Sequence, residues 1–171
     1  MLKVAVIGCG TIANNAHIPS YLKNPDVEIK WFCDIIPERA DGAVEKYGCG
    51  QAIVDYHDIL DDPEIEAVSV CTPNRMHTTI AIDFLEHGKH VLCEKPMSLC
   101  YRDCERMCAA AEKAGKKLMI GQCNRFSAAH LLLKKYVDEK TFGEVRNVLF
   151  TRFSTTPDWG WDNWFLDAER S

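Results

Sequence analysis

The segment from Lys3 to Ala13 limits the folds open to this chain more than any other stretch. It begins with an apolar, β-branched run and continues at once with Gly8, Gly10 and Ala13 in the spacing GxGxxA. A buried strand, a tight glycine turn and a helix start in this order place a dinucleotide pyrophosphate against the N-terminus of the helix. A glycine triplet alone is a weak signal, but its position directly after a strand makes a dinucleotide site the favoured prediction.

The glycine turn has a mechanical role in this prediction. A side chain at Gly8 or Gly10 would keep the backbone away from the pyrophosphate, whereas the amides near Thr11 and Ile12 point at it. Ala13, in place of a third glycine, still permits close packing of the helix on the strand. The alternative is an ordinary turn between a strand and a helix.

The acid at the end of the next strand indicates which dinucleotide is bound. A strand predicted at Val27 to Cys33 ends at Asp34, 24 residues after Gly10, where this kind of fold places a carboxylate on the adenosine ribose. Asp34 can accept hydrogen bonds from both ribose hydroxyls, and its charge would repel the extra phosphate of NADP, so NAD is expected. Arg39 lies one helical turn further on and can pair with a 2′-phosphate, which keeps NADP as the alternative. A solvated acid in a turn is the other interpretation of Asp34.

Strands and helices alternate along the first 120 residues, which predicts an α/β fold with a doubly wound parallel sheet. The ligand of such a sheet lies outside the carboxyl ends of its strands. Further strands are expected at 51–54, 66–71, 90–93 and 117–120, and helices at 11–24, 37–47, 77–88 and 98–114, the last capped by Ser98.

The pattern changes after residue 123, so we predict a dinucleotide-binding domain over 1–123 and the start of a second, mostly missing α+β domain over 124–171. The second segment shows a helix at 127–138 and an alternating strand at 145–153 with no obvious partner. Its tail holds Trp159, Trp161 and Trp164, which form a candidate association surface if exposed.

Composition excludes several classes of protein. The net charge of −5 argues against a nucleic-acid or anionic-membrane partner, and no apolar run approaches the roughly 20 residues that span a bilayer. The nine cysteines are odd in number and form no CxxC pair, so neither a disulfide framework nor a metal site is predicted, and reduced thiols in a cytoplasm fit best.

Two groups of cysteines carry separate expectations. Cys100, Cys104 and Cys108 follow a helical spacing with Met107 and are expected to form one apolar face. Cys9 lies inside the glycine turn and is expected to be reachable by alkylating reagents.

Motifs at the predicted strand ends together resemble a known family. In this combination and order the chain resembles the Gfo/Idh/MocA oxidoreductases, the sugar and inositol dehydrogenase family, over essentially its whole length. The motifs are Gly8 to Ala13, Asp34, Cys71-Thr72-Pro73-Asn74 with His77, Gly88-Lys89-His90-Val91, Glu94-Lys95-Pro96 and Asn124-Arg125-Phe126. Of these, the Glu-Lys-Pro motif is far more specific than the glycine turn.

The resemblance implies a catalytic role for Lys95. The family's lysine in this motif reaches the substrate hydroxyl beside the nicotinamide, where an ammonium can stabilise developing negative charge on oxygen. Glu94 is then expected to position the cofactor ribose or the lysine, and Pro96 to favour an extended backbone at Lys95. The alternative is a surface salt bridge between Glu94 and Lys95.

The same resemblance places further contacts on two loops. The loop Thr72, Pro73 and Asn74 is expected to contact the nicotinamide half of the cofactor, with His77 opening the next helix. For Asn74 and His77, a capping and packing role is the alternative.

The second of these loops follows the last predicted strand. Asn124 is expected to contact the cofactor and Arg125 the substrate, while an interdomain salt bridge is the alternative for Arg125.

The family implies NAD- or NADP-dependent hydride transfer with a secondary hydroxyl of a sugar, inositol or related polyol. It also implies a second domain and a homo-oligomer. The family's Asp and His motif would be expected just after Ser171, so the fragment is expected to bind cofactor with little turnover. A non-catalytic dinucleotide-binding regulatory or interaction module is the alternative, and an enzyme of this fold acting on an imine, tetrapyrrole or dihydrodiol is a third interpretation.

Overall fold

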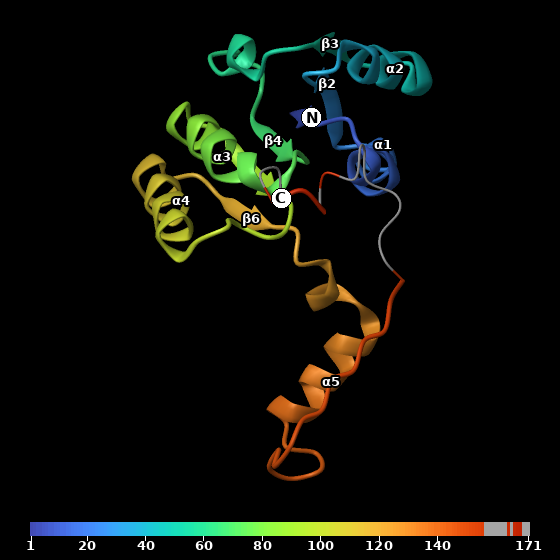
Figure 1. Ribbon diagram of the computed structural model, residues 1–171, viewed down its shortest axis with the longest axis vertical. Helices are drawn as coiled ribbons and strands as arrows, with labels where there is room; N and C mark the ends of the chain where they lie inside the picture. The colour runs from blue at the N-terminus through green and yellow to red at the C-terminus, as the bar shows by residue number, and fades with distance from the viewer. Residues whose placement is uncertain (156–163, 165, 169–171) are drawn as a thin grey trace. The chain divides into compact units, whose positions relative to one another are not determined.

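The computed structural model describes residues 1–155, 164 and 166–168, which form two units. The first unit comprises Met1–Gly121 with the described residues of Trp159–Ser171, and the second comprises the described residues of Gln122–Asp158. Figure 1 shows the elements of each unit. Trp159 and Trp161, to which a surface role was assigned from the sequence, lie outside the described residues.

The first unit is built on a parallel sheet of six strands in the order β3-β2-β1-β4-β5-β6. This confirms the predicted doubly wound fold, because the chain moves outward from β1 in one direction and then from β4 in the other. The strand order reverses between β1 and β4, and ligands of such sheets bind at the carboxyl ends on either side of that point. The strands are β1 Leu2–Ile7, β2 Val27–Cys33, β3 Gln51–Ile53, β4 Ala67–Val70, β5 His90–Cys93 and β6 Leu118–Ile120.

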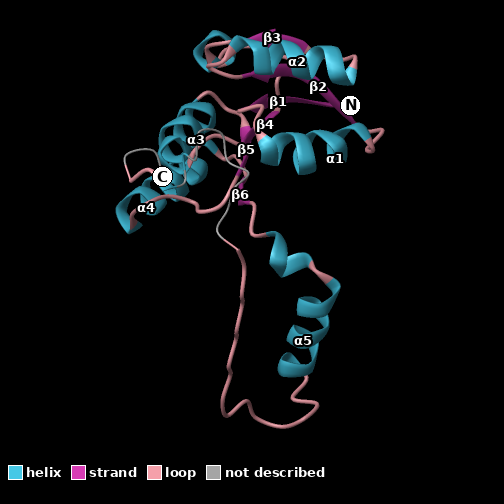
Figure 2. Ribbon diagram, turned by 45° about the vertical axis from the view of Figure 1, so that its right-hand side comes forward, coloured by secondary structure: helices cyan, strands magenta, loops and turns pink. Residues whose placement is uncertain are grey.

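Helices connect the strands and cover both faces of the sheet (Figure 2). The α-helices of this unit are α1 Ile18–Leu22, α2 Pro37–Tyr47, α3 His77–Glu86 and α4 Tyr101–Ala114; the short helical turns are η1 Ala13–His17, η2 Tyr56–Ile59 and η3 Asn74–Met76. The helix predicted at 11–24 is irregular, because η1 is a π-helical segment that runs directly into α1, whose second residue is Pro19.

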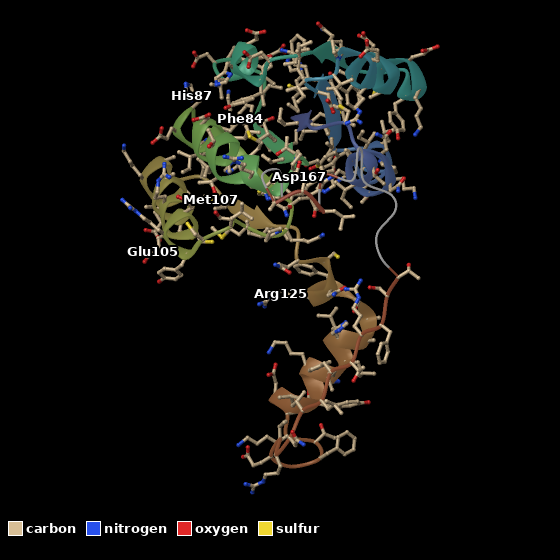
Figure 3. The ribbon with its side chains drawn as sticks, viewed as in Figure 1. Phe84, His87, Glu105, Met107, Arg125 and Asp167 are labelled. Atoms are coloured by element: carbon tan, nitrogen blue, oxygen red, sulfur yellow. The ribbon has the colours of Figure 1, made fainter. Side chains whose placement is uncertain are left out.

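The alternation of side chains along each strand divides the core in two. On β1, Ile7 packs with the α3 and α4 side, while Val6 packs with the α1 and α2 side. Phe84 of α3 and Met107 of α4 are fully buried in the first cluster and come from neighbouring helices (Figure 3). Each such side chain contributes roughly 1.5–3 kcal/mol of burial free energy, so both faces of the sheet hold the strand ends in place.

Two expectations on α4 were wrong. The helix begins at Tyr101 after Cys100 rather than after Ser98, because the Ser98 hydroxyl instead accepts a hydrogen bond of 2.8 Å from Thr78 Oγ1. Cys100 and Cys108 are exposed, and the buried face of the helix carries Met107, Ala110 and Ala111.

The second unit contains a short helical turn, η4 Cys123–Phe126, and the helix α5 Ala128–Asp138, whose N-cap is Ser127. The strand predicted at 145–153 is not formed, because no described segment pairs with it and a lone strand leaves its backbone hydrogen bonds unmade. No helix within the described residues is both long and apolar enough to cross a membrane.

Candidate functional site

The polar segments that follow the strands are tied together at the carboxyl edge of the sheet. Gly8 N donates to the carbonyl of Cys33 at 2.7 Å, and Cys71 N donates to the carbonyl of Ile7 at the same distance. Glu94 N continues the ladder by donating to the Val70 carbonyl at 2.9 Å. The segments after β1, β2, β4 and β5 therefore form one edge, as the sequence predicts for the motif residues of this unit.

Gly8 and Gly10 serve different purposes in the turn. Gly8 has φ +92°, and a Cβ there would lie 2.8 Å from the backbone C and O of Cys71 and 3.0 Å from Thr72 N. Gly8 is therefore required by the close approach of the segment after β4. A Cβ at Gly10 would meet nothing within 4 Å, so Gly10 borders open space.

The glycine turn is stabilised by Asn14, which the sequence patterns did not identify. The side-chain amide nitrogen of Asn14 donates hydrogen bonds to the carbonyls of Cys9 at 2.8 Å and Gly10 at 3.0 Å. The helical segment starts with Asn14 N donating to Gly10 O at 3.1 Å. Backbone amides in the first turn of a helix point out of its N-terminus, which is where Thr11 and Ile12 lie.

Asp34 connects the glycine turn to the end of β2. It is 7% exposed, and its two carboxylate oxygens accept hydrogen bonds from Cys9 N and Ile36 N, each at 2.9 Å. Each oxygen keeps lone-pair capacity for a further donor. The sequence did not predict that Asp34 also fixes the turn, because that contact spans 25 positions.

The thiol of Cys9 is not the reactive group that its place in the turn indicated. Cys9 is 4% exposed, and burial together with the Asp34 charge raises its pKa to about 12. The charge of Arg39 opposes this rise. A protonated, buried thiol is a poor nucleophile, so the expectation of ready alkylation was wrong.

Glu94 and Lys95 differ sharply in their surroundings. Glu94 is 9% exposed, whereas Lys95 is exposed and forms no ion pair with any residue of the described part of the chain. The Lys95 amide donates to Glu94 Oε2 at 3.1 Å, and the peptide bond to Pro96 is cis. The two side chains thus form no surface salt bridge, and the ammonium of Lys95 is available at the strand end.

His77 joins two of the motif loops. Its ring is 1% exposed, with Nδ1 2.7 Å from the carbonyl oxygen of Pro96 and Nε2 2.9 Å from that of Thr72. Carbonyl oxygens only accept, so both contacts are satisfied together when each nitrogen carries a proton. Of the two interpretations of His77, the structure supports packing, since the buried ring fixes the loop after β4 against the loop after β5.

Thr72 has an orphaned polar atom at this edge. Its Oγ1 is buried and has no hydrogen-bond partner among the described residues, while Pro73 and Asn74 beside it are half-buried. Buried hydroxyls are almost always paired. An unpaired hydroxyl next to Gly8, together with the open space at Gly10, fits a polar ligand across the turn.

The remaining predicted contacts belong to the second unit. Asn124 and Arg125 lie in the turn η4 and are exposed (Figure 3). Their contacts with cofactor and substrate stay predictions. The described residues hold no group of three or more His, Cys, Asp or Glu side chains arranged to bind a metal ion.

Comparison with known proteins identifies the family. Residues 2–122 match the sequence profile described as an oxidoreductase family with an NAD-binding Rossmann fold. The chain belongs to the Gfo/Idh/MocA oxidoreductase family. This confirms the resemblance drawn from the motifs.

Individual relatives are similar over nearly all of this chain. An inositol 2-dehydrogenase from Salmonella typhimurium is 31% identical over 92% of the chain and 48% of its own length. A D-glucoside 3-dehydrogenase from Escherichia coli is 34% identical over 93% of the chain and 46% of its own length. The chain thus spans about half the length of the curated relatives it matches.

Solved structures agree with the fold. The WlbA dehydrogenase from Bordetella pertussis, in complex with NADH and UDP-GlcNAcA, has a TM-score of 0.78 and 31% identity over 83% of this chain and 41% of its own. A 3-ketoreductase from Actinomadura kijaniata, in complex with TDP-benzene and NADP, has a TM-score of 0.77 and 30% identity over 85% of this chain and 44% of its own.

Proposed function

We propose that this chain binds NAD across the carboxyl edge of the sheet. The observation that carries the proposal is the open space over Gly10 after β1 together with the unpaired Thr72 hydroxyl after β4, the two strands between which the strand order reverses. Family membership supports it, since the matched profile is that of an NAD-binding domain. The first-turn amides near Thr11 and Ile12 would receive the pyrophosphate.

NAD rather than NADP is proposed on the charge of Asp34. A buried carboxylate at the end of β2 favours the two ribose hydroxyls and repels a 2′-phosphate. Arg39, on α2, is the residue that would accommodate NADP. The similar proteins of known structure include complexes with each cofactor, so the choice rests on the residues of this chain.

We propose that the reaction is hydride transfer between the nicotinamide and a secondary hydroxyl of a sugar, inositol or related polyol. When bound, the nicotinamide supplies the hydride acceptor or donor. The exposed ammonium of Lys95 would donate a hydrogen bond to the substrate oxygen and stabilise the negative charge that develops there. Glu94 would orient Lys95, and Thr72 to Asn74 would line the cofactor's nicotinamide half.

The proposal extends to the arrangement of the whole protein. We assign 1–123 to the cofactor domain and 124–171 to the beginning of a substrate and oligomerisation domain, in which Asn124 would contact the cofactor and Arg125 the substrate. The dehydrogenase relatives support a small-molecule substrate, and the nine free cysteines support a cytoplasmic location. A homo-oligomer is proposed on the resemblance to the family alone. A non-catalytic binding module is disfavoured by the available Lys95.

A calorimetric titration of the chain with NAD, NADH and NADP tests the proposal. We expect saturable binding of NAD and NADH with weaker binding of NADP. Gly10→Trp should abolish binding, because the indole would fill the space over the turn. Gly42→Trp on α2, where a Cβ also meets nothing within 4 Å, is the matched control and should bind as the wild type does. Unchanged affinity in the Gly10 variant would contradict the site.

A further inference from the structure

A buried line of polar side chains leads to Glu94, and its other members, His17, Ser69 and Tyr21, lie outside the motifs already described. His17 ends the π-helical segment η1, and its Nε2 lies 3.0 Å from Glu94 Oε1 while its Nδ1 lies 3.2 Å from Ser69 Oγ. The hydroxyl of Tyr21, one helical turn further on, forms a hydrogen bond with the same Ser69 oxygen. Ser69 is fully buried on β4, and His17 and Glu94 are each 9% exposed.

Counting donors assigns one direction to this line. A carboxylate only accepts hydrogen bonds, so Nε2 of His17 must carry a hydrogen and donate it in the hydrogen bond to Glu94. In the neutral ring, Nδ1 then accepts the Ser69 hydroxyl hydrogen, and Ser69 Oγ accepts the Tyr21 hydroxyl hydrogen. Every side-chain polar group of the line is satisfied in this arrangement, and it ends on the Glu94 carboxylate.

The Glu94 carboxylate is confined on each side. Oε1 accepts from His17, Oε2 accepts from the Lys95 amide at 3.1 Å, and a Cβ at Gly121 would lie only 2.9 Å from Oε1. Burial raises the pKa of Glu94, but the hydrogen bonds from His17 and the Lys95 amide outweigh it and leave the pKa below its ordinary value. The ionised carboxylate therefore fixes the backbone at Lys95.

We propose that His17 is a positioning residue for the Lys95 loop: through its Nε2–H it holds the Glu94 carboxylate, and Glu94 in turn holds the backbone that places Lys95 at the nicotinamide side of the cleft. This inference rests on the proposed function. π-helical segments recur at functional sites, and here the segment turns His17 from the glycine-turn helix toward β4 and β5.

The test compares His17→Leu, which removes the donor, with His17→Gln, whose amide can still donate to Glu94. Binding of NADH is measured through nicotinamide fluorescence, and binding of ADP, which probes only the glycine-turn half, through calorimetry. We expect His17→Leu to weaken NADH binding about tenfold, the size typical of losing one partner of a buried charged hydrogen bond. ADP binding should be unchanged and His17→Gln should restore most of the NADH affinity. His87→Leu, at an exposed position after α3 (Figure 3), is the matched control.

Each other outcome overturns the proposal in a recognisable way. Equal losses of NADH and ADP affinity in His17→Leu would show a general structural role, and unchanged NADH affinity would show no role. If the wild type binds neither nucleotide, the proposed function fails and this inference with it. Should His17→Leu not fold, ¹⁵N NMR of the wild-type ring decides, because the Nε2–H tautomer is required and the Nδ1–H tautomer contradicts it.

Discussion

Replacing Gly8 with alanine is expected to destabilise the fold, while the same change at Gly10 spares stability and weakens nucleotide binding. At Gly8 the new Cβ would lie 2.8 Å from the Cys71 backbone, which cannot move aside by changing a rotamer. Crowding of this kind costs about 1–3 kcal/mol, and the left-handed conformation at φ +92° adds about 1–2 kcal/mol for a residue with a Cβ. Together they predict a loss of about 2–5 kcal/mol in the free energy of unfolding.

Urea unfolding followed by circular dichroism measures the Gly8 effect. With a typical m-value of about 2 kcal/mol per molar urea, the midpoint should fall by about 1–2.5 M. Gly10→Ala, whose Cβ meets nothing, should keep its midpoint within about 0.5 M of the wild type yet lose at least about tenfold in NADH affinity, or roughly 1.4 kcal/mol. Equal midpoints for Gly8→Ala and the wild type would refute the steric argument.

Three further perturbations follow from the geometry. Burial raises the pKa of Asp62, but hydrogen bonds from Lys30 and an indole N–H outweigh it and lower the pKa to about 2. Because this folded-state pKa is depressed, the stabilisation is present above pH 4 and is lost as pH falls toward 2, so Asp62→Asn should cost about 1–2 kcal/mol at pH 7 in urea unfolding and almost nothing at pH 2. His77→Phe removes the ring nitrogens that contact the carbonyls of Thr72 and Pro96 and should cost about 1–3 kcal/mol in the same assay; wild-type stability would contradict the role of His77 in joining these two loops. Iodoacetamide at pH 8 should label the exposed Cys123 rapidly and Cys9 only after unfolding, and mass spectrometry showing early Cys9 labelling would contradict its burial.

The sheet could be predicted from local patterns because each strand carries its own signal. The β-branched runs at Val27–Cys33 and His90–Cys93 form strands with those bounds, and Pro37 opens α2 while Gly48 follows its last residue. Four of the five motifs of the first unit fall where strands end, since connections in an alternating fold leave little choice of edge. The fifth, Gly88 to Val91, was predicted at a strand end but lies at the start of β5.

The hydrogen bonds that organise the site could not be predicted in this way. His17 contacts Ser69 and Glu94 across 52 and 77 positions, and no periodicity within one helix indicates a partner so far along the chain. Ser98 is of a residue type that caps helices, but its hydroxyl forms a hydrogen bond with Thr78 instead. Cys9 was expected to be reactive because the residues next to it in sequence do not show that it is buried. Local patterns gave the positions of the side chains, and tertiary contacts decided their roles.

The central claim is that NAD binds at the carboxyl edge of the sheet, over the glycine turn. A ¹H–¹⁵N NMR titration of the chain with NADH tests it most directly. We predict the largest amide shifts at Gly10 to Ile12, at Asp34, and at Thr72, with little change at Lys3 or Glu66 on the opposite edge. Shifts confined to that opposite edge, or no shifts at saturating NADH, would contradict the account.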